Sequence, residues 1–346
     1  MKHAAISAAR IARADMIPKS VPVWQQAMRE AVTDVAELLR LLNIPAAAID
    51  LADTAIRDFP LRVPHSYLAR MRKADVNDPL LLQVLPGAAE EIRLAGFVTD
   101  PVGDLASVRE NGLLQKYAGR ALLITTGACA IHCRYCFRRS FPYSEQTASR
   151  EEWASALAQL RQDASIEEVI LSGGDPLSLS DSKLASLVAE LEKIPHIQRL
   201  RIHTRQPIVL PERVDDQLIA WLSKGRLQKI IVLHCNHPQE LSQAVIQSIH
   251  RLKQANVTLF NQAVLLKRIN DNADVLTRLS KDLFNYGVIP YYLHQLDRVE
   301  GASHFEVPDE QALAIHQQLR ETLPGYMLSE LVREIPGEPS KTPLRK

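Results

Sequence analysis

The sequence lacks long apolar runs, an excess of charge of one sign, and the cysteines that a disulfide framework requires. No run of about 18 apolar residues occurs, which excludes a membrane-spanning helix. The 41 basic and 40 acidic residues leave a formal net charge of +1, so no overall field attracts nucleic acid or anionic lipid. The 4 cysteines, three of them clustered, do not suggest a disulfide framework, and their clustering indicates metal binding in a reducing cytoplasm.

The remaining composition is that of an ordinary folded protein. Hydrophobic residues make up 46% and charged residues 23%, which excludes disordered and fibrous classes. A chain of 346 residues suffices for one large α/β barrel or for two smaller domains. We divide it into a helical N-terminal region (1–110), an α/β core (111–325) and a short C-terminal tail (326–346).

Within the core, short β-branched runs alternate with amphipathic helical stretches. Strands are predicted at 121–126, 168–172, 199–204, 229–235, 257–266 and 288–296, and the last helix near 309–322. Six such units in a row predict a parallel sheet with right-handed crossovers, either open or curled into a barrel. Reactive groups then belong at the C-terminal ends of the strands.

Polar motifs do fall at these strand ends. In chain order they are the cysteine cluster, Ser172-Gly-Gly-Asp-Pro176, Thr204-Arg205, His234-Cys-Asn-His237 and Gln295-Leu-Asp297, while Asn261-Gln262 lies within the fifth strand. Two adjacent glycines at a strand end let backbone amides approach a ligand, although alone they also suit an ordinary tight turn. The pattern predicts a single site at this edge of the sheet.

The cysteine cluster offers three thiols within eight residues, Cys129, Cys133 and Cys136. A structural zinc site takes four ligands, so it would also need His132, His234 or Cys235. Three thiolates on one loop can instead hold three irons of a [4Fe–4S] cluster, because soft sulfur ligands suit iron–sulfur chemistry. The fourth iron then has no protein ligand.

The CxxxCxxC spacing, with Tyr135 just before the last cysteine, resembles the signature of radical S-adenosylmethionine (SAM) enzymes. In that family the open iron chelates the amino and carboxylate groups of SAM, and an electron from the cluster generates a 5′-deoxyadenosyl radical. The resemblance implies a partial (β/α)6 barrel with Cys129, Cys133 and Cys136 as cluster ligands. It also implies SAM contacts from Tyr135, Ser172, Gly173, Gly174, Asp175 and Gln262.

A longer set of motifs is similar to one branch of that family, the lysine 2,3-aminomutases. It includes RVPHSYLARM, LQKYAGRALLITTGAC, LSGGDPL, RQPIVLPERV, LHCNHPQEL, NQAVLLKRIND and the tail PGEPSKTP. The chain looks most like the short bacterial form that makes (R)-β-lysine for modification of translation elongation factor P. The implied activity is an isomerase that moves the α-amino group of L-lysine to C3.

The same family uses pyridoxal 5′-phosphate (PLP), held by a lysine near the C-terminus that corresponds to Lys341. An amine on a flexible stem suits that covalent role. The family's phosphate-binding run corresponds to Lys116, Tyr117 and Arg120, and Lys116 replaces an arginine there.

The resemblance also implies substrate contacts and partners. Arg138 corresponds to the arginine that receives the substrate carboxylate, while Asp297 and Glu334 correspond to two acids that receive the side-chain ammonium. Glu334 replaces an aspartate of the family. The implied partners are L-lysine, an electron donor such as flavodoxin or ferredoxin, and the ligase that lysylates elongation factor P.

Three alternatives stay open. The same chemistry could act on another amino acid such as glutamate, although Asp297 and Glu334 argue against an anionic side chain. A radical SAM enzyme could modify RNA or protein without PLP, with Lys341 a bystander. A zinc-stabilised binding protein without catalytic activity is the third.

Overall fold

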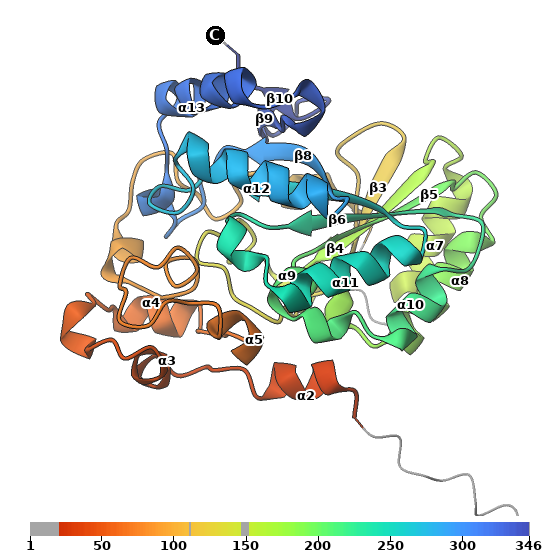
Figure 1. Ribbon diagram of the computed structural model, residues 1–346. Coiled ribbons are helices and arrows are strands. Elements are labelled where there is room, and N and C mark those ends of the chain that lie inside the picture. Colours follow the sequence, from red (N-terminus) through yellow and green to blue (C-terminus); the bar gives the residue numbers. More distant parts are fainter. Residues whose placement is uncertain (1–20, 111, 147–151, 346) are drawn as a thin grey trace, which may run out of the picture.

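The computed structural model describes residues 21–110, 112–146 and 152–345 (Figure 1). No helix in these ranges is long and apolar enough to cross a membrane. Figure 1 shows the N-terminal helices and the C-terminal elements on opposite sides of the central strands.

The N-terminal region consists of short helices and loops. Its helices are α2 (Val23–Arg29), α3 (Val35–Leu41), α4 (Asp53–Asp58) and α5 (His65–Leu68), with 3-10 turns η1 (Ala46–Ala48), η2 (Ala88–Glu91) and η3 (Leu105–Ser107). Asp34 begins α3, because its carboxylate accepts a hydrogen bond from the Glu37 amide at 2.7 Å. These elements form an apolar core that also contains Ala130 and Ile131, so the N-terminal region packs against the cysteine loop.

One sheet contains every strand of the described chain, in sequence order. The strands are β1 (Val108–Glu110), β2 (Leu113–Leu114), β3 (Arg120–Thr126), β4 (Glu168–Gly173), β5 (Arg199–Thr204), β6 (Gln228–His234), β7 (Thr258–Val264), β8 (Ile289–His294), β9 (Glu330–Arg333) and β10 (Thr342–Pro343). Strands β3 to β9 pair in parallel, whereas β1, β2 and β10 are antiparallel additions at the two edges.

The six predicted strands are confirmed as β3 to β8, and the predicted six βα units with them. The larger helices that follow these strands are α7 (Glu152–Gln162), α8 (Asp181–Glu192), α10 (Asp216–Leu222), α11 (Gln243–Gln254), α12 (Ala273–Asn285) and α13 (Asp309–Thr322). Smaller helical turns are α6 (Tyr143–Gln146), α9 (Gln206–Val209), η4 (Pro176–Ser178), η5 (Pro211–Arg213), η6 (Pro238–Glu240), η7 (Ser303–Phe305) and η8 (Gly325–Met327). Strand β9 lies within 326–346, where the sequence indicated only a tail.

The two faces of the sheet differ in chemistry because side chains alternate along each strand. On one face, Leu171, Ile202 and Ile231 pack with the helices in the largest apolar core. On the other face of β5, Arg201 and His203 line a cavity. An open sheet in sequence order, with helices packed on one face and a cavity on the other, fits the predicted partial (β/α)6 barrel.

Candidate active site

One cavity of about 280 Å³ lies on the face of the sheet that carries Arg201 and His203. A cavity that holds one water needs only about 10–15 Å³. This cavity is therefore large enough for organic ligands. Every site residue predicted from the sequence lines it. These residues are Lys116, Tyr117, Arg120, Cys129, Cys133, Tyr135, Cys136, Arg138, Ser172, Gly173, Gly174, Asp175, Gln262, Asp297, Glu334 and Lys341. The structure thus brings together residues that lie up to 225 positions apart (116 to 341).

The cysteine loop follows β3 and carries three free thiols that face this cavity. Burial, reinforced by the neighbouring Cys133, raises the pKa of the Cys136 thiol to about 11. Burial also raises the pKa of Cys129. Thiols in this state bind a metal only by releasing their protons, so binding there is coupled to pH.

A buried ion-pair cluster fixes the same loop. The guanidinium of Arg134 donates to both oxygens of the Glu90 carboxylate, at 2.7 and 2.5 Å, and Arg139 donates to Glu90 at 2.7 Å. The Arg134 amide donates to the carbonyl of Gln83 at 2.9 Å. Sequence analysis missed Glu90, since a lone acid in a loop-rich region carries no signal of its partner.

The two glycines of the strand-end motif lie directly against the start of the cysteine loop. A Cβ atom on Gly174 would lie 2.6 Å from the Ala128 carbonyl oxygen. Gly173 has φ +117°, and a Cβ there would lie 2.6 Å from the Thr126 oxygen. Both positions therefore require glycine.

The Asp175 side chain is already fully engaged within the protein. Its carboxylate accepts hydrogen bonds from Thr204 Oγ1 at 2.7 Å and from the amides of Arg205 at 2.8 Å, Gln206 at 3.0 Å and Leu177 at 3.0 Å. It joins the ends of β4 and β5. Any contact of this motif with a ligand is then left to the backbone of Gly173 and Gly174.

Tyr135 and Ser172 also bond within the protein. The Tyr135 hydroxyl accepts a hydrogen bond from Asn236 Nδ2 at 2.7 Å and lies 3.3 Å from Nε2 of His234. The Ser172 hydroxyl accepts one from Arg138 Nη1 at 2.9 Å. Gln262 pairs with His234 across β6 and β7, which places both at the cavity wall.

Arg138 is held by an acid that the sequence did not reveal. Its Nε atom donates to Asp104 Oδ2 at 2.6 Å, and the other Asp104 oxygen pairs with Lys116 Nζ at 2.7 Å. Asp104 is only 2% exposed. Burial alone would raise its pKa, but the charges of Arg138 and Lys116 hold it below the usual range, so Asp104 stays ionised.

Lys341 reaches the cavity from the C-terminal segment. Its Nζ atom lies 2.6 Å from Glu334 Oε2, while Glu334 Oε1 accepts a hydrogen bond from the Tyr117 hydroxyl at 2.6 Å. The Lys341 ammonium also lies 5.8 Å from the centre of the Tyr292 ring. The Arg120 guanidinium lies 4.6 Å from the centre of the Tyr117 ring, so these basic and aromatic groups form one wall.

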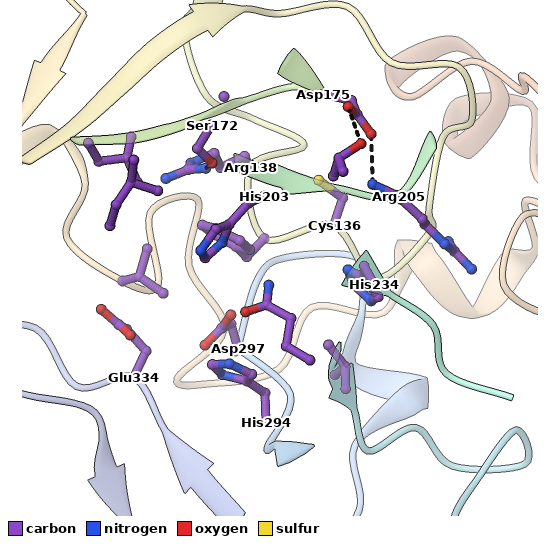
Figure 2. A pocket seen from close by; sticks show the side chains of 18 of the residues that line it. Cys136, Arg138, Ser172, Asp175, His203, Arg205, His234, His294, Asp297 and Glu334 are labelled. Carbon is purple, nitrogen blue, oxygen red and sulfur yellow. Dashed lines mark hydrogen bonds between the residues drawn. The ribbon is translucent and has the colours of Figure 1, made fainter. Parts of the chain in front are cut away.

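Asp297 faces the cavity from the opposite side to Arg138, with Glu334 beside it (Figure 2). Burial raises the pKa of Asp297 to about 7, although the Lys341 charge opposes the shift. Asp297 is therefore close to half-ionised at neutral pH and can become fully charged beside a cationic ligand.

Three histidines near the C-terminal ends of strands line the cavity, His203, His234 and His294 (Figure 2). The sequence placed His234 among the strand-end motifs, whereas His203 and His294 were missed as site residues. Burial lowers the pKa of each, to about 3 for His234, so all three stay neutral. The Nε2 atoms of His203 and His294 are buried without a hydrogen-bond partner. Alternating polar residues in RLRIHT were the readable signal for His203, because buried parallel strands are usually apolar on both faces.

Among the described residues, no group of three or more His, Cys, Asp or Glu side chains is arranged to hold a single metal ion. The three cysteine thiols nevertheless share one loop and one cavity.

Comparisons with known proteins agree with this geometry. Residues 123–223, which contain the cysteine loop and the two-glycine motif, match the model of the radical SAM superfamily. L-lysine 2,3-aminomutase of Escherichia coli is 48% identical over 322 residues, covering 93% of this chain and 94% of that protein. The chain belongs to the lysine 2,3-aminomutase family.

Two further members of the family show how far the likeness extends. L-lysine 2,3-aminomutase of Haemophilus influenzae is 44% identical over 319 residues, covering 92% of this chain and 94% of that protein. The Clostridium subterminale enzyme of the same name is 32% identical over 322 residues, covering 93% of this chain and 77% of its own. The predicted family and its short bacterial form are confirmed.

Membership makes this protein an isomerase of the radical SAM type, whose cofactors are a [4Fe–4S] cluster and SAM. The residues present fit both groups. The described part of the chain supplies three free thiols on one cavity-facing loop, and the backbone of Gly173 and Gly174 lies beside that loop. Soft thiolate ligands suit such a cluster.

Proposed function

We propose that this lysine 2,3-aminomutase family member converts L-lysine to β-lysine, using the cluster, SAM and PLP in the cavity. The observation that carries the proposal is that Lys341 lines the same cavity as all three loop cysteines. A lysine amine can hold a carbonyl cofactor as a Schiff base, so the place of Lys341 in this cavity supports PLP as a third cofactor.

For the cluster, we assign Cys129, Cys133 and Cys136 as the three ligands. Together with SAM, the cluster supplies a hydrogen-abstracting radical by one-electron cleavage of a sulfonium bond. With only these three thiolates as ligands, the chain would leave the fourth iron free for SAM, and the Gly173-Gly174 backbone beside the loop would be available to contact SAM. Tyr135, Ser172, Asp175 and Gln262 belong to the wall that shapes the SAM site, and the closed hydrogen bonds of Asp175 make its role one of support.

We assign PLP to the part of the cavity that Lys341 lines. Lys341 is the proposed covalent anchor, and Lys116, Tyr117 and Arg120 are proposed to surround its phosphate. The Nε2 atoms of His203 and His294 are buried without a hydrogen-bond partner in the described structure, and a bound ligand would supply one. When bound, PLP supplies a reactive carbonyl and a conjugated ring that stabilises an unpaired electron beside a migrating nitrogen.

The charges of the cavity support lysine as the substrate. Arg138 is proposed to take the substrate carboxylate, and Asp297 and Glu334 its side-chain ammonium. A buried carboxylate in its charged form binds a cation strongly, because the ion pair forms away from water. The γ-carboxylate of glutamate would instead face two acids, which disfavours that alternative.

The protein's remaining contribution is positioning and exclusion of water. Arg138 is held by Asp104 and Ser172, and Lys341 by Glu334, so both ends of the proposed substrate site are ordered in advance. A site fixed in this way limits the C–H bonds within reach of a radical.

We further propose a flavodoxin or ferredoxin as electron donor, and delivery of (R)-β-lysine to the ligase that lysylates elongation factor P. The support is the similarity of the tail PGEPSKTP and of the chain as a whole to the short bacterial form.

The test is an anaerobic assay of L-lysine conversion by protein reconstituted with iron and sulfide. Omitting SAM, PLP or the reductant should each abolish β-lysine. Cys133→Ser should lose activity, whereas the matched control Cys235→Ser should keep it, because Cys235 lies outside the loop and its thiol bonds to the His237 carbonyl. Formation of β-glutamate without β-lysine would contradict the substrate, and a colourless protein with stoichiometric zinc would contradict the cluster.

Borohydride trapping separates the proposal from a radical enzyme that modifies RNA or protein. A reduced PLP adduct should map to Lys341 alone. Absence of an adduct there, in protein that still cleaves SAM, would favour the RNA- or protein-modifying alternative.

A further inference from the structure

Arg205, the residue after β5, lies beside the cysteine loop without belonging to it (Figure 2). Its side chain is 6% exposed. The Nη1 atom donates a hydrogen bond to the sulfur of Cys133 at 2.7 Å. A buried guanidinium therefore touches one of the three proposed cluster ligands.

The other terminal nitrogen of the guanidinium, Nη2, is held by polar groups from three other segments, whereas Nε is buried without a hydrogen-bond partner among the described residues. Its Nη2 atom donates to Gln83 Oε1 at 2.6 Å, to Glu240 Oε2 at 3.1 Å and to the Tyr67 hydroxyl at 3.3 Å. The Arg205 amide donates to Asp175 Oδ2 at 2.8 Å. The orientation of the guanidinium toward sulfur is thus set from both ends of the residue.

Glu240 balances the arginine from the far side. It is 0% exposed, and its carboxylate also accepts hydrogen bonds from the amides of Asn236 at 3.0 Å and His237 at 3.2 Å. Burial alone would raise the pKa of Glu240, but Arg205 and these donors hold it below the usual range. Both members of the pair are therefore ionised, with the cation between the carboxylate and the sulfur.

The positions of these two charges affect the reduction potential of a cluster bound to Cys133. Reduction places one additional negative charge on an iron–sulfur cluster and its thiolates. A cationic N–H donor on a ligand sulfur stabilises that charge and raises the reduction potential, whereas a carboxylate behind the donor opposes it. If the Arg205–Glu240 pair served only to stabilise the fold, its guanidinium would not need to donate a hydrogen bond to the sulfur of Cys133.

We propose that the Arg205–Glu240 pair sets the reduction potential of the cluster through the hydrogen bond to Cys133. The inference rests on the proposed role of Cys133 as a ligand. Arg205 acts through that ligand and is a tuning residue. The described structure also contains a matched pair away from the cavity, Arg213 and Asp181, joined at 2.9 Å and similarly buried.

The experiment is an EPR-monitored redox titration of the holoenzyme without substrate. Glu240→Gln should raise the midpoint potential, because the cation is no longer balanced. The double variant Arg205→Gln/Glu240→Gln should lower it below that of the unaltered protein, since the sulfur loses its cationic donor. The control Arg213→Gln/Asp181→Asn should leave the potential unchanged.

Three other results would contradict the proposal or its premise. Unchanged potentials in both test variants, with full iron and sulfide content, would overturn the inference. Loss of cluster from the test variants but not from the control would overturn it as well, because the pair would then serve assembly. Absence of a [4Fe–4S] signal from the unaltered protein would instead refute the proposed ligands themselves.

Discussion

The Nζ atom of Lys341 lies 2.6 Å from Oε2 of Glu334, the acid proposed to receive the ammonium group of the substrate. Burial would raise the pKa of Glu334, but Lys341, Tyr117 and Lys116 together lower it. Glu334 is therefore an anion that already holds one ammonium group. A lysine substrate that displaces Lys341 from PLP would offer a second ammonium to the same carboxylate.

Replacing the proposed anchor should separate cofactor attachment from folding. We expect Lys341→Arg to keep the ion pair with Glu334 and the fold but to lose the borohydride-trapped PLP adduct, because a guanidinium does not condense with an aldehyde at neutral pH. Aminomutase activity should fall by at least about 10²-fold. Mass mapping of the reduced protein provides the measurement. Lys183→Arg, on the exposed part of α8, is the matched control.

Glu334 tests the ammonium site. Loss of a charge-assisted hydrogen bond is worth about 1.5–3 kcal/mol, so Glu334→Gln should raise the KM for lysine by roughly 10- to 100-fold. Glu334→Asp, which keeps the charge, should raise it less. Steady-state kinetics at saturating PLP provide the measurement. Equal effects of the two variants would show that carboxylate charge at this position does not bind the substrate.

Asp297 should give lysine binding a dependence on pH. Its pKa is raised to about 7, so below that pH the carboxyl becomes neutral and loses its attraction for an ammonium group. The Asp297 contribution to affinity should then fall by up to about tenfold per pH unit below 7. Profiles of kcat/KM for the unaltered protein and Asp297→Asn should diverge above pH 7 and converge below it.

The same raised pKa has the opposite consequence for folding. The unfolded chain ionises this carboxyl near its ordinary pKa of about 3.9, while the folded protein resists ionisation until about 7. The folded state therefore loses stability as pH rises between these values. Denaturant unfolding should show Asp297→Asn gaining stability relative to the unaltered protein over that range, and a constant difference would contradict the shift.

Asp104 should matter although sequence analysis assigned it no role, because it holds Arg138 in place. Replacing it leaves the buried Arg138 without its charge partner, and breaking a buried pair costs about 3–5 kcal/mol. We expect Asp104→Asn to lower the free energy of unfolding by a sizeable part of this amount and to raise the KM for lysine. A variant with reduced stability but unchanged KM would show that Asp104 does not orient Arg138.

Gly174 tests the contact between the two-glycine motif and the cysteine loop. A methyl group at 2.6 Å from the Ala128 oxygen must displace backbone, so Gly174→Ala should reduce iron and sulfide content per chain. Gly325→Ala is the control, because nothing lies within 4 Å of a Cβ there. Equal cluster content in the two variants would contradict the contact.

Six strands could be predicted from the sequence, together with the polar motifs at their C-terminal ends. The runs at 168–172 and 199–204 are bounded by helices of clear periodicity, so β4 and β5 were placed to within one residue. Strand β9 was missed because Glu330–Arg333 is short and gains its burial from tertiary contacts, including pairing with β8 and β10.

The residues that orient the site were harder to predict. Asp104 and Glu90 are single acids in or beside short 3-10 turns, and only the fold brings them to Arg138 and Arg134. Their function depends on tertiary contacts that leave no local pattern. His294 gave no signal either, because an imidazole at a strand end is as often structural as functional.

The proposed radical chemistry depends on one iron of the cluster being free of protein ligands. Mössbauer spectroscopy of the anaerobic, ⁵⁷Fe-reconstituted protein, recorded with and without SAM, tests this most directly. We predict that one iron in four changes its isomer shift when SAM is added. Four irons that are unaffected by SAM, in protein with full cluster content, would contradict the account.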